Sequence, residues 1–289
     1  MNKNIAIKLD GQKIYKEGLE DLKTQICDSP TLGINQISTS PTLGIIQVGD
    51  NPASTKYVTL KIKDIEYIGA KSVLKKLPSS HTTEQIIEAV NDFNNDKNID
   101  AYIVQLPLPD HIDTELVLNS IDPKKDADGL HPINVMGLID TKTSTPIACT
   151  PLGIIQLLKC YNIETDGANV VIVGRGATVG RPLSLLLSNS EYNSTVTLAH
   201  SHTKDLQELC KNADILVAAT GYPGLINKDF IKVGATVIST GVTYIDGKLC
   251  ADTTDDVAEV AGYLTPNPGG VGPMTRLCLL KNLITIANK

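Results

Sequence analysis

A tyrosine and a lysine, Tyr57 and Lys61, stand four residues apart in the segment YVTLK. In a helix, residues at this spacing lie on one face, so their side chains can touch. A lysine can exchange a proton with substrate or water when burial or neighbouring groups bring its pKa toward neutrality. The pair is therefore a candidate for proton chemistry, and a lysine on a solvated helix face is the ordinary alternative.

Two further polar residues of the first half could act with this pair. Gln105 lies in the apolar run VQLPLP and, being neutral, could orient the lysine without cancelling its charge. Asp128 lies in KKDADGL, directly before Gly129. Each has a structural alternative that is favoured when it is taken singly, since an amide can end a strand and Asp-Gly commonly forms a turn.

A glycine-rich turn in the second half predicts a nucleotide site. The apolar strand NVVIV at 169–173 leads directly into Gly174, Gly176 and Gly180, and then into a helix. Glycines let a phosphate approach the backbone, and a helix N-terminus offers free N–H groups and the positive end of its dipole. The spacing is one residue longer than the usual dinucleotide fingerprint, so a tight turn that merely needs glycine is the alternative.

The residues after the next strand indicate which nucleotide would bind. An NAD site commonly has an acidic residue there that bonds the ribose 2′-hydroxyl. The chain reads LAHSHT at 198–203, which contains no acid. Arg175, Ser201 and one of the two histidines could instead donate to the 2′-phosphate of NADP, although His202 is more readily explained as an ordinary loop residue. We therefore expect NADP and leave NAD open.

Composition limits the other classes of function. A formal net charge of −6 and a pI near 5.4 argue against a nucleic-acid partner. The six cysteines are far apart and form no C-x-x-C pair, which argues against a zinc site or a disulfide framework and favours buried thiols in a reducing compartment. No apolar stretch has the length of a signal peptide or a membrane helix. We expect a cytoplasmic protein with no metal and no membrane contact.

Apolar β-branched runs alternate with helical patterns along the chain, which predicts βαβ units, parallel sheets and an α/β fold. The expected strands lie at 42–49, 71–78, 101–109, 169–176, 195–201, 213–221 and 234–241. The expected helices lie at 11–27, 53–69, 83–96, 113–120, 151–160, 179–189 and 203–211, and one more follows near the C-terminus.

Two lobes are predicted by the length of 289 residues and by a break in periodicity. The break is the segment TKTSTPIACTP at 141–151, which combines small, polar and proline residues. We expect an α/β substrate lobe at 1–145, a Rossmann-type doubly wound parallel sheet at 146–272, and a final helix at 273–289 that packs back on the first lobe. The active-site cleft would lie between the lobes.

Motifs along nearly the whole chain resemble those of the bifunctional methylenetetrahydrofolate dehydrogenase/methenyltetrahydrofolate cyclohydrolase family. They are Lys56-Tyr57 to Lys61, VQLPLP (104–109), KDADGLHPIN (125–134), TPLG (150–153), VGRGATVGRP (173–182), AHSHT (199–203) and TPNPGGVGPMT (265–275). VQLPLP and PGGVGPMT are the most specific. The resemblance implies oxidation of 5,10-methylenetetrahydrofolate by NADP to the methenyl cation, and then hydrolysis to 10-formyltetrahydrofolate.

The resemblance also implies roles for individual residues. Lys61 serves the hydrolytic step, Tyr57 packs on the folate and holds the lysine, and Gln105 tunes the lysine. Asp128 anchors the pterin ring, and Ser54 lines the substrate pocket. The wall where nicotinamide meets folate would be shaped by Gly270, Gly272 and Pro273. A homodimer is usual in the family. The implied nucleotide contacts are Gly174, Arg175, Gly176, Thr178, Val179, Gly180, Ser201, Thr220 and Gly241.

The chain departs from the family pattern in or next to the nucleotide lobe. Ala199 stands where a cysteine is common, Ser239-Thr240 replace an Asp-Val pair, and Asp252 to Asp255 differ from the common GDVxF run. Two alternatives follow. The first is a monofunctional dehydrogenase, against which the retained folate residues argue, and the second is a non-catalytic NADP-binding regulator, which would need no folate lobe.

Overall fold

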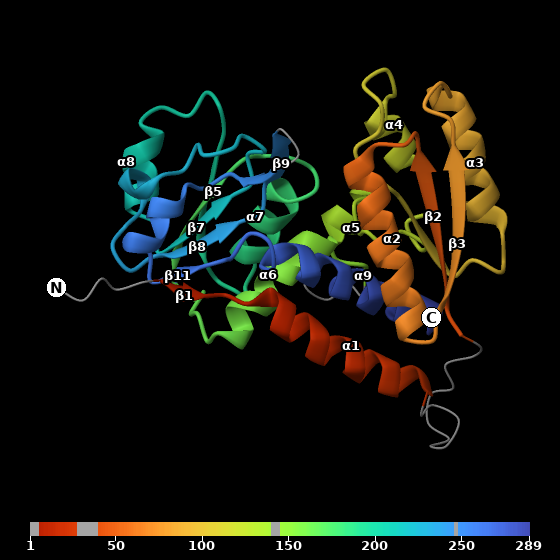
Figure 1. Cartoon of the computed structure of the whole chain (residues 1–289), viewed down its shortest axis with the longest axis horizontal. Coiled ribbons are helices and arrows are strands. Elements are labelled where there is room, and N and C mark those ends of the chain that lie inside the picture. The colour runs from red at the N-terminus through yellow and green to blue at the C-terminus, as the bar shows by residue number, and fades with distance from the viewer. Residues whose placement is uncertain (1–5, 28–39, 140–144, 246–247) are drawn as a thin grey trace. The chain divides into compact units, whose positions relative to one another are not determined.

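The computed structural model describes residues 6–27, 40–139, 145–245 and 248–289 (Figure 1). Contacts divide these residues into two compact units, named here by their sheets. The six-stranded unit contains the described residues of Met1–Tyr15, Leu138–Thr143 and Thr150–Thr275. The three-stranded unit contains those of Lys16–Gly137, Ser144–Cys149 and Arg276–Lys289. Three of the points of division fall inside helices, which are α1 (Gly11–Cys27), α6 (Cys149–Cys160) and α9 (Val271–Ala287).

The three-stranded unit is built on a parallel sheet in the order β3-β2-β4. Its strands and the helices that follow them are β2 (Thr42–Val48), α2 (Pro52–Tyr67), β3 (Lys71–Leu77), α3 (Thr83–Asn95), β4 (Ala101–Val104), α4 (Thr114–Asn119) and α5 (Pro132–Gly137). Ile46 and Val48 of β2 pack with Phe93 of α3 in one hydrophobic core. Because side chains alternate along a strand, Ile45 and Gln47 point to the opposite face. Figure 1 shows α2 and α3 on opposite sides of these strands.

Helix α2 begins at a clear capping signal. The side chain of Asn51 accepts hydrogen bonds from the backbone N–H groups of Ala53 and Ser54, and Pro52 occupies the first helical position. One face of the helix is buried, and it consists of Ser54, Val58, Lys61, Asp64 and Ile65. A lysine on that buried face is unusual, because lysine is among the residues that are least often buried.

The last helix, α9, makes polar contacts with the three-stranded unit from Arg276 onward. Nη1 of Arg276 lies 3.0 Å from Oδ2 of Asp64 in α2, and both side chains are less than 10% exposed. The side-chain amide of Asn282 donates to the backbone carbonyls of Ala127 at 2.8 Å and Ile147 at 2.9 Å. These contacts bring the C-terminal residues to the same unit as α2.

The six-stranded unit holds a fully parallel sheet in the order β1-β11-β8-β7-β5-β6. The strands are β1 (Ile7–Lys8), β5 (Asn169–Val173), β6 (Thr195–Ala199), β7 (Ile215–Ala218), β8 (Thr236–Ser239) and β11 (Tyr263–Leu264). The connecting elements are α7 (Gly180–Ser188), α8 (Leu206–Lys211), η1 (Lys228–Phe230), η2 (Asp255–Glu259) and an antiparallel hairpin of β9 (Val242–Ile245) and β10 (Lys248–Ala251). From β5 the chain goes to β6 on one side and then to β7 on the other, so the strand order reverses at β5.

The α/β class with parallel sheets is confirmed. Every strand and helix that the sequence predicts is present with ends shifted by a few residues. The elements that were not predicted are β1, β9, β10, β11, α5 and the two short 3-10 helices. The boundary between 145 and 146 stays a prediction, whereas the compact units are discontinuous in sequence and β1 pairs with β11 in the six-stranded sheet.

One expectation about the cysteines is wrong. Cys160, in the last turn of α6, is exposed rather than buried. Cys149, Cys210 and Cys278 are buried, and burial raises the pKa of the Cys210 and Cys278 thiols to about 12. All five cysteines whose side chains are described are free thiols.

Within the described ranges, none of the helices combines the length and the apolar character that a membrane crossing requires. The same ranges contain no cluster of three or more His, Cys, Asp or Glu side chains arranged to hold a metal ion.

Candidate functional site

Lys61 lies on the buried face of α2 and is only 5% exposed. Its Nζ donates a hydrogen bond of 3.1 Å to Oε1 of Gln105 and lies 5.3 Å from the centre of the Tyr57 ring. The other end of the Gln105 amide donates to the carbonyl of Leu106 at 2.6 Å, which turns the amide oxygen toward the lysine. The structure therefore brings the three predicted residues together around one buried amine and excludes a solvated lysine.

The end of β4 fixes the position of Gln105. Residues 45 and 46 of β2 pair with residues 103 and 104 of β4, and the backbone N–H of Gln105 donates to the carbonyl of Ile46 at 2.8 Å. Gln105 is thus the first residue past the ladder, on the face that also carries Gln47. Helix α2 packs on β2 and β3, so the side chain of Lys61, in the middle of the helix, can reach Gln105 at the end of the neighbouring β4.

Asp128 lies in the loop before α5, and the structure shows what shapes that loop. Asp126, two residues earlier, is almost fully buried and accepts hydrogen bonds from the backbone of Gly129 and His131 and from the amide of Asn134. Burial raises the pKa of the Asp126 carboxyl, and these donors oppose the rise. Sequence reasoning overlooked Asp126, although an aspartate three residues before a glycine is a recognisable loop-forming pattern.

Cys149 lies beside Asp128 in the three-stranded unit. Its backbone N–H donates to the carbonyl of Asp128 at 3.1 Å, and its buried thiol donates to the carbonyl of Ala127 at 3.3 Å. The pKa of this thiol is raised, first by burial and then by the negative charge of Asp128. The predicted pterin-binding acid is therefore in the same neighbourhood of the unit as a buried, protonated thiol.

Two buried polar atoms, at the start of α2 and the end of β2, have no hydrogen-bond partner among the described residues. One is Oγ of Ser54, which lies seven residues before Lys61 on the buried face of α2. The other is Oε1 of Gln47, whose amide nitrogen donates to Thr55 and to the carbonyl of Gly49. Buried polar atoms are normally bonded, so these two indicate a position for a polar ligand or water. Gln47 was overlooked, and its signal is a lone amide in the apolar strand TLGIIQV.

The glycine turn after β5 shows why two of its glycines differ. A Cβ on Gly174 would lie 2.1 Å from the carbonyl of Ala219, and its φ of +119° also favours glycine. A Cβ on Gly176 would meet no atom within 4 Å. Nothing in the described chain therefore requires glycine at 176, and the open space is the kind that a phosphate of NADP fits. Gly180 packs on Gly174 and begins α7, which has no side-chain cap.

The other predicted nucleotide residues surround this turn at the carboxyl ends of the strands. Arg175 and Ser201, both exposed, each come two residues after the paired residues Val173 and Ala199 of β5 and β6. Thr178 is exposed and Val179 half-buried at the start of α7. Thr220 follows β7 and Gly241 follows β8. Since the strand order reverses at β5, this edge of the sheet is where such folds bind dinucleotides.

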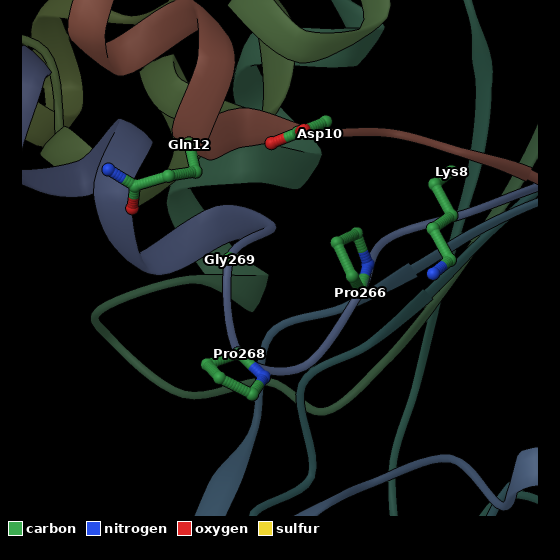
Figure 2. Close-up of a pocket in the computed structure, with 6 residues that line it drawn as sticks. All are labelled: Lys8, Asp10, Gln12, Pro266, Pro268 and Gly269. Atoms are coloured by element: carbon green, nitrogen blue, oxygen red, sulfur yellow. The ribbon is translucent and has the colours of Figure 1, made fainter.

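The loop 265–275 also belongs to the six-stranded unit. Gly270 is buried, and a Cβ on Gly11 would lie 1.9 Å from its carbonyl oxygen. Pro273 is buried in the first turn of α9. A pocket of about 420 Å³ is lined by Lys8, Asp10, Gln12, Pro266, Pro268 and Gly269, and Figure 2 shows these six residues. Gly270 and Pro273 are not among the residues that line this pocket.

Comparisons with known proteins agree with both halves of this arrangement. The catalytic domain of the tetrahydrofolate dehydrogenase/cyclohydrolase family matches residues 9–128, and the NAD(P)-binding domain of that family matches residues 148–289. Together the two matches cover most of the chain in the order that the family domains require.

Three solved structures illustrate the similarity. The bifunctional methylenetetrahydrofolate dehydrogenase/cyclohydrolase of Campylobacter jejuni is 38% identical, with 98% of both chains covered and a TM-score of 0.89. A methylenetetrahydrofolate dehydrogenase of the silkworm Bombyx mori is 36% identical, with 98% of both chains covered and a TM-score of 0.89. The dehydrogenase-cyclohydrolase of Trypanosoma brucei, complexed with NADP and an inhibitor, is 35% identical over 98% of this chain and 97% of that one, with a TM-score of 0.89.

A doubly wound parallel sheet with a glycine turn at its switch point, together with an α/β unit that buries a lysine, defines a nucleotide-dependent enzyme of two α/β units. The chain belongs to the tetrahydrofolate dehydrogenase/cyclohydrolase family. This confirms the resemblance drawn from the sequence motifs.

Proposed function

We propose that the chain oxidises 5,10-methylenetetrahydrofolate with NADP and hydrolyses the resulting 5,10-methenyl cation to 10-formyltetrahydrofolate. Membership of the family supports both activities. The observation that carries the hydrolytic step is the buried amine of Lys61, held by Gln105 and faced by the ring of Tyr57. The monofunctional dehydrogenase remains the second candidate, and it would leave this buried amine without a reaction to serve.

The dehydrogenase step requires little acid-base catalysis from the protein. The methylene carbon lies between two nitrogens that stabilise the cation left by hydride loss, so positioning supplies most of the catalysis. Bound NADP would accept that hydride, and Gly174, Gly176 and the start of α7 would hold its phosphates. We assign Arg175 and Ser201 to the 2′-phosphate because their strands end beside each other and residues 198–203 contain no acid.

The cyclohydrolase step needs a group that moves a proton. Water attacks the methenyl carbon and loses one proton, which gives a carbinolamine. The bond from this carbon to one ring nitrogen then breaks as the remaining hydroxyl proton leaves and the formyl C=O forms, and the nitrogen takes up one proton, so that one proton is released overall. We assign the proton transfer to Nζ of Lys61. Asp128 is assigned to the pterin ring by the family resemblance, and Ser54 offers a buried hydroxyl that has no partner among the described residues.

The test is Lys61→Met, with Lys63→Met as its control because Lys63 is an exposed lysine of the same helix. Absorbance of the reduced nicotinamide and of the methenyl intermediate would be followed in one reaction with 5,10-methylenetetrahydrofolate and NADP. We expect Lys61→Met to accumulate the methenyl compound with cyclohydrolase activity at least about 100-fold lower, within the range for loss of a general acid or base. Wild-type hydrolysis in Lys61→Met would contradict the assignment of Lys61.

We also propose that the chain acts in the cytoplasm as a homodimer. Free thiols at the five described cysteines and the family resemblance support this proposal. Light scattering of the purified protein measures its mass in solution. A homodimer should have twice the 31.0 kDa of one chain, and a mass equal to that of one chain would contradict the proposed dimer.

A further inference from the structure

A carboxylate outside the predicted nucleotide residues is fully buried at the carboxyl end of the six-stranded sheet. Asp252 follows β10 and is 0% exposed. Its Oδ2 accepts hydrogen bonds from the backbone N–H groups of Thr220 at 2.6 Å and Gly221 at 3.1 Å. We propose that Asp252 is a positioning residue for NADP, which holds the loop after β7 in the form that receives the nucleotide. The proposal rests on the proposed function of this unit.

The loop that Asp252 holds lies directly against the phosphate turn. A Cβ on Gly174 would lie 2.1 Å from the carbonyl oxygen of Ala219 and 3.3 Å from the backbone nitrogen of Thr220. The N–H of Ala219 also donates to the carbonyl of Val173, the last residue of β5. A shift of Thr220 would therefore move the surface on which Gly174 rests.

A second segment of the predicted nucleotide site meets the same carboxylate. A Cβ on Gly241 would lie 2.1 Å from Oδ2 and 2.2 Å from Oδ1 of Asp252. The backbone N–H of Asp252 donates to the carbonyl of Gly241 at 3.3 Å. The carboxylate occupies the space that a side chain at 241 would need, which explains why glycine stands there. One buried acid thus contacts the loops that follow both β7 and β8.

The hydrogen bonds that a carboxylate accepts, rather than the effect of its charge on the nucleotide, explain why an acid suits this place. A negative charge beside a site for the phosphates of NADP is electrostatically unfavourable by itself. A carboxylate accepting backbone N–H groups makes charge-assisted hydrogen bonds, which are about twice as strong as neutral ones. An asparagine would keep one acceptor oxygen of similar shape, and an alanine would keep none.

The experiment compares Asp252→Ala and Asp252→Asn with Asp214→Asn. Asp214 is a matched control, because its carboxylate accepts the backbone N–H of Asn169 at the opposite, amino end of the same strands. The KM for NADP and the KM for 5,10-methylenetetrahydrofolate would be measured, together with the binding of NADP by calorimetry. Hydrolysis of 5,10-methenyltetrahydrofolate without nucleotide serves as an internal readout of the folded chain.

We expect Asp252→Ala to raise the KM and the Kd for NADP about tenfold or more, because hydrogen bonds to a charged group are lost from the loop. Asp252→Asn should raise them about threefold or more, and Asp214→Asn should leave them within about twofold of wild type. The KM for the folate and the cyclohydrolase rate should stay within about twofold in every variant. If Asp252→Ala does not fold, the KM and the Kd for NADP of Asp252→Asn decide whether Asp252 positions the nucleotide.

Unchanged or tighter NADP binding in Asp252→Asn would overturn the proposal. So would a parallel loss of cyclohydrolase activity, because that would indicate a merely structural role for the carboxylate. If the wild-type chain catalyses neither reaction, the proposed function fails instead, and calorimetry with NADP still decides the role of Asp252.

Discussion

The side-chain amide of Gln105 fixes where the buried amine of Lys61 points. The two groups are 3.1 Å apart, and the backbone N–H of Gln105 continues the hydrogen bonding of β4 to β2. The acceptor is therefore anchored to the sheet rather than to a mobile side chain. A lysine has four rotatable bonds, so an acceptor fixed in this way removes much of the freedom that would otherwise place its charge elsewhere.

Replacing Gln105 with leucine should lower cyclohydrolase activity about 10- to 100-fold. The substitution removes the acceptor but keeps a side chain of similar size, and a hydrogen bond to a charged group contributes about 1.5 to 3 kcal/mol. Hydrolysis of 5,10-methenyltetrahydrofolate without nucleotide measures the effect. Gln207→Leu, at an exposed glutamine of the six-stranded unit, is the control. A wild-type rate in Gln105→Leu would show that Lys61 is positioned by other groups.

The turn between β5 and α7 separates a structural glycine from a functional one. Gly174 is required by its φ of +119° and by the nearby carbonyl of Ala219. Gly176 has neither constraint. The same short motif therefore contains one position where glycine maintains the fold and another where it leaves room for a ligand.

Gly174→Ala and Gly176→Ala should consequently differ in their effects. Gly174→Ala should lower the thermal midpoint, because the backbone conformation alone costs about 1 to 3 kcal/mol for a non-glycine residue. Gly176→Ala should keep the midpoint within about 2 °C and weaken NADP binding about tenfold, since its Cβ would enter the proposed phosphate position. Melting curves and NADP titrations check both. Unchanged NADP affinity in Gly176→Ala would contradict the phosphate assignment.

Helix α9 depends on a buried ion pair with α2. Arg276→Met would leave Asp64 buried without its cation, at a cost of about 3 to 5 kcal/mol, and adding Asp64→Leu should restore most of the loss. Denaturant titration measures both changes. Lys75→Met is the control, because the Lys75–Asp92 pair is partly exposed and should contribute less than about 1 kcal/mol. Equal losses in the single and double variants would rule out this account.

The sequence predicts the long elements well and the short ones poorly. Helices such as α2 and strands such as β2 are long enough for their periodicity to show. Strands β1 and β11 have two residues each, and their pairing depends on the rest of the sheet. The candidate residues were found by motif, whereas Asp126, Gln47 and Asp252 were recognised only from burial and hydrogen bonds. Burial depends on tertiary contacts, which no local pattern records.

Taken as a whole, the molecule does not consist of two consecutive pieces of chain. The six-stranded unit takes its first edge strand from the N-terminus, and the three-stranded unit takes most of its last helix from the C-terminus. Each unit therefore combines segments that are far apart in the sequence. The domain boundaries expected at 145 and 272 stay a prediction about which residues serve folate and nucleotide.

Expressing residues 1–145 and 146–289 separately should show this interdependence. The first fragment would lack Asn282 and Arg276, and the second would lack β1. We expect each fragment to melt without a cooperative transition or at least about 10 °C below the full chain, with recovery on coexpression. Circular dichroism melts measure this. If residues 146–289 melt cooperatively within a few degrees of the full chain, the interdependence is absent.

The pairing of β1 with β11 also sets an order of events during synthesis. Ile7 leaves the ribosome long before its partner Tyr263. The edge of the six-stranded sheet therefore stays open until β11 has been made, because a strand cannot pair with a segment that has not yet been synthesised. The unpaired β11 side of β8 is available to other chains in the interval between the synthesis of β8 and that of β11, so a chaperone that covers this edge would protect the chain during that interval.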